Sequence, residues 1–239
     1  MTWIKICGTT SLEDAQLAVE AGADALGFVF YEKSPRYIDP EAAREVVQQL
    51  PAQVEKVGVF FNMSQLEAFK LVESVGLTAM QFYLAMDQPA NERTGSSVAY
   101  GKPIRFYLAL PAAWILADEA RIKGLSESFE QWGESIPPEA RPTDLFNTFF
   151  LDAADRGEPG GTGKSFDWAR AAHLVEIMRK RVRVVVAGGL NPSNVIEAIH
   201  TLKPFGVDVV SGVEARPGKK DPAKVRAFIE AVRAADNSR

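Results

Sequence analysis

The sequence contains very few of the residues that form disulfides or bind metals. It has one cysteine, Cys7, and two histidines, His173 and His200, in 239 residues. A single thiol excludes an intramolecular disulfide framework and any site built from several thiolates. Two histidines also argue against a histidine-based metal centre. We therefore expect no metal site.

Long apolar runs are missing as well. The longest uncharged run of apolar residues, 106–117, has 12 residues and includes Pro111, whereas a membrane-spanning helix needs about 20. Residues 1–7 lack the basic start and the long apolar stretch of a secretory signal. We expect a cytoplasmic protein with a reduced thiol and no membrane partner.

Neither sign of charge dominates. The chain carries 27 Lys and Arg against 31 Asp and Glu, which gives a net charge of −4. This mild acidity argues against a dedicated nucleic-acid surface. Hydrophobic residues make up 46%, a usual fraction for a globular protein, and the length is ample for a buried core.

Short β-branched or apolar runs alternate with longer amphipathic stretches along the chain. Residues 25–30 (ALGFVF) are apolar throughout, which is typical of a parallel strand buried on both faces. Helix starts carry capping signals, such as the Ser-x-x-Glu pattern at 64–67. The strand-like runs are 3–6, 25–30, 55–61, 78–84, 104–110, 146–151, 183–187 and 207–210. Eight such units without a dividing linker predict an α/β protein, a single (β/α)₈ TIM-barrel domain over 1–239.

The middle of the chain is less regular, so we expect irregular structure around helices 4 and 5. Turn residues fill 87–101, where a helix would be expected. Residues 112–132 are compatible with a helix that breaks at Gly124. Later in the chain, Asn191 as cap and Pro192 in the first turn predict the start of the seventh helix.

Two residues at predicted strand ends have side chains suited to proton transfer. Active sites of such barrels lie at the C-terminal ends of the strands. Cys7 follows the first strand and Asp152 directly ends the sixth, so the two side chains can face each other across the mouth. An acid and a base on opposite sides of a substrate suit a proton-transfer isomerisation. Taken alone, such a cysteine is more often a small buried hydrophobe.

Glycine-rich turns follow the last three predicted strands. Gly188-Gly189 and Ser211-Gly212 follow the seventh and eighth, where backbone N–H groups of such barrels commonly bind phosphate. The simpler interpretation is that these glycines only make tight turns. Residues 159–165 (PGGTGKS) are not a nucleotide P-loop, because Glu158 stands where that motif needs glycine. Lys164 would add positive charge near a ligand.

Arg36 follows the second predicted strand. Its planar guanidinium group could hold a carboxylate through two parallel hydrogen bonds. The alternative is an ordinary solvated arginine in a loop.

Together these motifs resemble the phosphoribosylanthranilate isomerase family of tryptophan biosynthesis. The resemblance covers about residues 2–81 and 149–235. It is carried by IKICG (4–8), AGADALGFVF (21–30), KSPRY (33–37), LDA (151–153), GGTGK (160–164), AGGL (187–190) and SGVE (211–214).

The resemblance implies a TIM barrel that performs an Amadori rearrangement without a cofactor. It implies that Asp152 is the general acid, which protonates the ribose ring oxygen, and that Cys7 is the general base, which removes the C2 proton. Arg36 would contact the anthranilate part of the substrate. The single phosphate would be bound by the glycine loops, through Gly161, Gly163, Gly188, Gly189, Ser211 and Gly212. The partner is thus a small phosphorylated substrate; a homo-oligomer is left open and is not indicated.

The chain departs from the family pattern in one region. Family members usually carry Gln-Leu-His-Gly after the fourth strand, whereas this chain has Gln81-Phe82-Tyr83-Leu84, and residues 82–148 form a longer segment. This segment motivates the alternative of a diverged barrel that binds a phosphorylated ligand, either without catalysis or with an altered substrate. The related isomerase of histidine biosynthesis is disfavoured, because Cys7 replaces an aspartate and no second pair of glycines follows strands 3 and 4.

Overall fold

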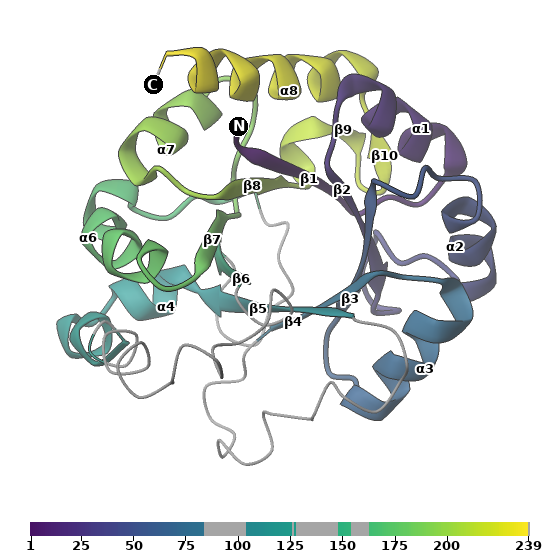
Figure 1. The fold of residues 1–239 in the computed structure, drawn as a ribbon, viewed down its shortest axis with the longest axis horizontal. Coiled ribbons are helices and arrows are strands. Elements are labelled where there is room, and N and C mark those ends of the chain that lie inside the picture. Colours follow the sequence, from purple (N-terminus) through teal and green to yellow (C-terminus); the bar gives the residue numbers. More distant parts are fainter. Residues whose placement is uncertain (84–103, 126, 128–147, 154–162, 239) are drawn as a thin grey trace.

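The computed structural model describes residues 1–83, 104–125, 127, 148–153 and 163–238. Eight parallel strands form a closed barrel in chain order (Figure 1). Their bounds are β1 Trp3–Cys7, β2 Ala25–Phe30, β3 Glu55–Phe60, β4 Ala79–Tyr83, β5 Arg105–Pro111, β6 Thr148–Asp152, β7 Arg183–Val186 and β8 Gly206–Val209. The barrel closes where β1 pairs with β8, from Trp3 opposite Gly206 to Ile6 opposite Val209. The predicted (β/α)₈ fold is confirmed.

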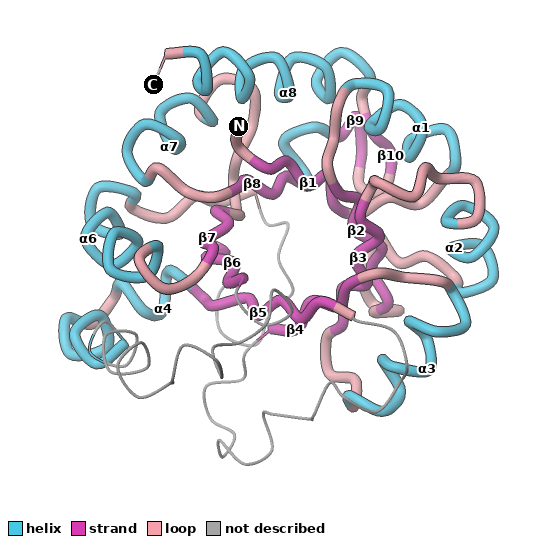
Figure 2. Tube along the Cα trace, in the orientation of Figure 1, coloured by secondary structure: helices cyan, strands magenta, loops and turns pink. Residues whose placement is uncertain are grey.

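Helices surround the barrel as an outer layer, and Figure 2 shows them outside the ring of strands. Their bounds are α1 Leu12–Ala21, α2 Pro40–Val47, α3 Gln65–Val75, α4 Ala112–Leu116, α6 Trp168–Arg179, α7 Val195–Leu202 and α8 Pro222–Asn237. After β8 come a 3₁₀ turn, η4 Ser211–Val213, and a short antiparallel hairpin of β9 Glu214–Arg216 and β10 Lys219–Lys220. None of the described helices has the length and apolar character needed to cross a membrane.

Capping side chains start several helices, among them the one predicted from the Ser-x-x-Glu pattern at 64–67. Ser11 accepts a hydrogen bond from the Asp14 backbone N–H, and Ser64 forms a capping box with Glu67. Asp221 accepts from two backbone N–H groups at the start of α8. Each cap satisfies backbone groups that have no partner inside the helix.

Two predicted helix boundaries are wrong. The stretch after β5 breaks at Ala117–Asp118, and residues 119–125 are helical, so Gly124 does not interrupt it. Asp118 explains the position, because its carboxylate accepts from the Ala120 backbone N–H and starts a new helical segment. Helix α7 begins at Val195, not after Asn191, because the Asn191 side chain caps a turn by accepting from Ser193. The predicted turn segment 87–101 and the end of the predicted helical stretch, 128–132, lie outside the described residues.

The core has two parts, one between strands and helices and one inside the barrel. The inner part combines small residues with two large aromatic rings, Tyr107 and Phe150. At the N-terminal end of the strands, Arg105 and Tyr107 both donate hydrogen bonds to the buried carboxylate of Glu55. The Tyr107 hydroxyl lies 2.5 Å from that carboxylate. This end is closed by packing, so it is the opposite end that is available to a ligand.

Candidate active site

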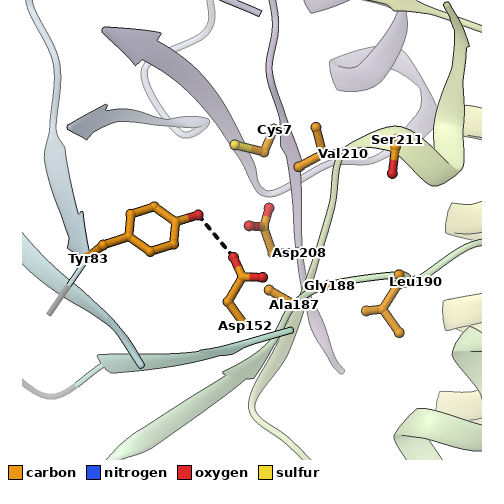
Figure 3. A pocket seen from close by; sticks show the side chains of 10 residues that line it. Cys7, Tyr83, Asp152, Ala187, Gly188, Leu190, Asp208, Val210 and Ser211 are labelled. Carbon is orange, nitrogen blue, oxygen red and sulfur yellow. Dashed lines mark hydrogen bonds between the residues drawn. The ribbon is translucent and has the colours of Figure 1, made fainter. Parts of the chain in front are cut away.

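A pocket lies at the C-terminal ends of the barrel strands, as the fold class predicts. Residues from β1, β4, β6, β7 and β8 and from the loops that follow them line it (Figure 3). They are Cys7, Tyr83, Asp152, Ala187, Gly188, Gly189, Leu190, Asp208, Val210 and Ser211. The pocket therefore brings together both predicted proton-transfer residues and part of the predicted phosphate site.

Cys7 is the last residue of β1 and is 5% exposed. Its sulfur lies over Gly27 on the neighbouring strand. A Cβ atom added to Gly27 would lie 2.5 Å from Cys7 Sγ and 3.0 Å from Lys5 Cε. A side chain at position 27 would thus displace both groups. Glycine at this position allows the thiol and the Lys5 side chain to lie together inside the barrel.

Lys5 is completely buried below Cys7, and its ammonium group lies 3.0 Å from Asp208 Oδ2. Burial opposes its charge, but the charges of Asp208 and Cys7 outweigh burial and raise the pKa of Lys5. The pKa of the Cys7 thiol is raised, because burial outweighs the opposing charge of Lys5. The positive charge of Lys5 therefore limits this rise and makes the thiolate more accessible than burial alone would allow.

Asp208 has one carboxylate oxygen on Lys5 and one for which the described residues offer no partner. Its Oδ1 atom is buried and makes no hydrogen bond within the described part of the chain. Burial raises the pKa of Asp208 in spite of the opposing charge of Lys5. The carboxylate lines the pocket between Cys7 and Asp152 (Figure 3).

Asp152 is the last residue of β6 and is also 5% exposed. The hydroxyl group of Tyr83, at the end of β4, donates a hydrogen bond to Asp152 Oδ2 at 2.9 Å. Burial and the charge of Asp152 raise the pKa of Tyr83 well above its ordinary value. The phenol thus stays protonated and remains a donor toward the carboxyl group.

The loops after β6, β7 and β8 pack backbone against backbone at glycines. A Cβ atom on Gly188 would lie 2.5 Å from the Ala153 nitrogen, and one on Gly189 would lie 2.5 Å from the Ser165 nitrogen. Both glycines also have positive φ, at 86° and 65°. A Cβ on Gly212 would lie 2.9 Å from the Leu190 carbonyl carbon and still closer to its oxygen. No other residue fits these positions without moving a loop.

Of the predicted phosphate residues, Gly188, Gly189 and Ser211 line the pocket. Gly163 lies beside Ser211, since a Cβ there would be 3.7 Å from the Ser211 hydroxyl oxygen. Gly212 supports the arrangement through its contact with the loop at Leu190. Gly161 lies outside the described residues.

Arg36 is buried next to the pocket but is not among the residues that line it. Its Nε and Nη2 atoms donate to the Glu214 carboxylate at 3.0 and 2.9 Å. Lys220 also contacts Glu214, at 3.3 Å, and donates to the Cys7 carbonyl oxygen at 2.5 Å. The arginine is therefore held in one orientation, in a network that reaches the backbone of Cys7.

Several residues of this site were not predicted from the sequence. Lys5 and Asp208 carried a signal, because each is a charged residue within an otherwise apolar strand of a parallel barrel. Glu214 ends the SGVE motif at 211–214, but its pairing with Arg36, 178 residues away in sequence, carried no signal, and neither did the contact of Lys220 with the Cys7 carbonyl oxygen. Among the described residues, no three potential ligands converge in a way that could hold a metal ion.

The chain matches one family model and several sequence relatives that carry the same name. The model of the family described as N-(5′-phosphoribosyl)anthranilate (PRA) isomerase matches residues 4–109 and 125–231. The N-(5′-phosphoribosyl)anthranilate isomerase of Citrifermentans bemidjiense is 40% identical over 229 residues, which are 96% of each chain. That of Pseudomonas fluorescens is 40% identical over 229 residues, 96% of this chain and 97% of the relative.

Solved structures agree with the sequence relatives. The crystal structure of phosphoribosyl anthranilate isomerase from Thermotoga maritima has a TM-score of 0.76 and 37% identity, covering 98% of this chain and 100% of that one. A second phosphoribosyl anthranilate isomerase structure is a complex with reduced 1-(o-carboxyphenylamino)-1-deoxyribulose 5-phosphate. Its TM-score is 0.74 at 34% identity, with the same coverage.

Proposed function

Because the chain belongs to the N-(5′-phosphoribosyl)anthranilate isomerase family of tryptophan biosynthesis, we propose that Cys7 and Asp152 act as its general base and general acid. The reaction proposed is the Amadori rearrangement of N-(5-phosphoribosyl)anthranilate to 1-(2-carboxyphenylamino)-1-deoxyribulose 5-phosphate. The observation that carries the assignment is that one pocket holds both side chains beside glycine loops suited to phosphate.

In the first step, Asp152 gives its proton to the ribose ring oxygen. The C1–O bond breaks, the ring opens, and the anthranilate nitrogen supplies the electron pair that forms an iminium ion. Asp152 is left as a carboxylate, which accepts the hydrogen bond from Tyr83. Because Asp152 is buried, water competes little for this charge-assisted hydrogen bond, and the bond is stronger than it would be at the surface.

In the second step, the Cys7 thiolate removes the proton from C2. The electron pair of that C–H bond forms the C1–C2 double bond of an enolamine, and the iminium nitrogen becomes neutral. Tautomerisation of the enolamine then gives the ketose product. Lys5 supports this step, because its buried positive charge favours the thiolate form of Cys7.

The non-reacting parts of the substrate fix its position. The phosphate would be bound by backbone N–H groups of Gly188 and Gly189 and by Ser211, with Gly163 and Gly212 beside them. Gly161 is proposed as a further phosphate-binding residue on the family resemblance alone, since it lies outside the described residues. Arg36 would contact the anthranilate group from the Glu214 network. Both proton transfers are performed by side chains, so the proposal needs no cofactor.

We also propose that residues 1–239 form one domain that acts in the cytoplasm. The pairing of β1 with β8 supports the single domain, since the barrel is complete only when both strands contribute, and the lack of a secretory signal pattern in residues 1–7 is the reason for proposing the cytoplasm.

A coupled assay tests the proposed function. N-(5-phosphoribosyl)anthranilate is generated in situ, and loss of its fluorescence is followed for the wild type, Cys7→Ser and Asp152→Asn. We expect turnover by the wild type and its collapse in both variants, each of which should retain the circular dichroism spectrum of the folded protein. A folded wild type without turnover would refute the activity and favour a barrel that only binds a phosphorylated ligand. Undiminished turnover in either variant would refute that residue's role.

A further inference from the structure

The hydrogen bond between Tyr83 and Asp152 spans the mouth of the barrel from β4 to β6, past β5 (Figure 3). On β5, Ala109 lies opposite Tyr83 in the strand register. Ala109 is completely buried and belongs to the inner cluster against which the Tyr83 ring packs. A small residue there leaves room for the ring to lie across the barrel and reach Asp152.

Aromatic neighbours fix the orientation of the Tyr83 ring. Phe61 contacts it edge to face, with ring centroids 5.9 Å apart and an interplanar angle of 71°. Phe61 is in turn contacted by Tyr31, at 5.0 Å and 62°. Edge-to-face arrangements of this kind are favourable for aromatic pairs. The hydroxyl group is thus held in place by contacts that do not involve Asp152.

The strength of the Tyr83 hydrogen bond changes during the proposed reaction. Hydrogen bonds to an ionised acceptor are roughly twice as strong as those to a neutral one. Asp152 is a neutral carboxyl group before proton donation and a carboxylate after it. An interaction that strengthens along the reaction coordinate stabilises the transition state more than the ground state.

We propose that Tyr83 is a positioning residue of the isomerase reaction, which holds the Asp152 carboxyl group toward the substrate and stabilises the carboxylate formed by proton transfer. The inference rests on the proposed role of Asp152 as general acid. It gives a function to a residue at which this chain departs from the usual pattern after the fourth strand.

The substitution Tyr83→Phe tests the inference, because it removes the hydroxyl group and keeps the ring that contacts Phe61. We expect kcat to fall about tenfold, equivalent to ~1.4 kcal/mol, with KM within about twofold of the wild type. A fall in kcat alone indicates lost transition-state stabilisation, because the phosphate and anthranilate contacts are unchanged.

The pKa of Asp152 provides a second readout. A donor to the carboxylate lowers its pKa, so loss of the Tyr83 hydroxyl should raise it by about one unit. The other titratable groups that line the pocket, Cys7 and Asp208, remain in place. The pKa is measured by NMR titration of protein labelled at aspartate carboxyl carbons, with the Asp152 signal identified by its loss in Asp152→Asn.

Tyr107→Phe is the matched control. It removes a buried tyrosine hydroxyl that bonds to Glu55 at the opposite end of the barrel, so kcat and the pKa of Asp152 should stay at their wild-type values. Two results would overturn the positioning role and leave the roles of Cys7 and Asp152 intact. One is a wild-type kcat in Tyr83→Phe, and the other is a lower kcat with an unchanged pKa of Asp152. Full turnover in Asp152→Asn would instead overturn the proposed function, and this inference with it.

Discussion

Gly212→Ala is the substitution for which the structure predicts the sharpest loss of substrate binding. The added Cβ would lie 2.9 Å from the Leu190 carbonyl carbon and 3.0 Å from Asn191 Cα, whereas ordinary contacts begin at 3.4 Å. Its contact with the Leu190 oxygen is closer still, and all three atoms belong to the backbone. The loop after β7 or the loop after β8 must therefore move as a unit, since no side chain can rotate away.

The size of the effect follows from this displacement. A misplacement on the order of 1 Å in an active site costs about 100-fold in rate. We expect kcat/KM of Gly212→Ala to fall by about this factor. Most of the change should appear in KM, because the phosphate is bound equally before and during the reaction. Overpacking of this kind also costs about 1–3 kcal/mol of stability.

Gly124→Ala is the control for a glycine-to-alanine change as such. Gly124 lies in a helical segment, and a Cβ atom there meets nothing within 4 Å. Helix propensity predicts that this variant is more stable by about 1 kcal/mol, with wild-type kinetics. Steady-state kinetics and thermal unfolding of both variants provide the test. A Gly212→Ala protein with the KM and melting temperature of the wild type would refute the account of the glycine loops.

Two further predictions concern the buried charges. Lys5→Met should raise the pKa of the Cys7 thiol further, because the opposing positive charge is lost, and reduce turnover at neutral pH by about tenfold or more. The thiolate absorbance, taken as the difference from the matching Cys7→Ser protein, reports this pKa because Cys7 is the only cysteine, and an unshifted titration would contradict the prediction. Burial alone would raise the pKa of Glu214, but hydrogen bonds from Arg36 and the charge of Lys220 outweigh burial and lower this pKa. The ionised Glu214 carboxylate therefore stabilises the folded protein fully above its unfolded-state pKa of about 4.3. This stabilisation is lost as the pH falls through the lower pKa of the folded state. Glu214→Gln should therefore be less stable than the wild type at pH 7 by about 1–3 kcal/mol. Urea unfolding at a series of pH values should show that the variant loses less stability on acidification than the wild type does. Parallel curves of stability against pH would refute the link between the ionisation of Glu214 and folding.

Much of the barrel could be predicted because its strands are short apolar runs with clear ends. The run at 25–30 forms β2 with the expected bounds, and Asp152 ends β6 as expected. Capping serines and aspartates act locally, so Ser64 and Asp221 could be identified from their own neighbourhoods. The seventh helix was misplaced because Asn191 can cap either a helix or a turn, and the local sequence favours neither.

The candidate site was predictable only to the extent that it depends on strand ends. Cys7 and Asp152 were placed in one pocket by the order of strands around the barrel. The bond between Asp152 and Tyr83 could not be predicted, because it joins β4 to β6 past the intervening strand, where the small Ala109 lies opposite Tyr83. The partner of Arg36 was also hidden, since Glu214 acquires its position from the hairpin that follows β8.

The charged groups around Cys7 have a consequence for the newly made chain. Cys7 is synthesised some 200 residues before Asp208, Glu214 and Lys220. A nascent chain without these three residues lacks the Asp208 partner of Lys5, the Glu214 partner of Arg36 and the contact from Lys220 to the Cys7 carbonyl oxygen. The thiol therefore acquires its charged surroundings only after β8 and the hairpin that follows it have been made.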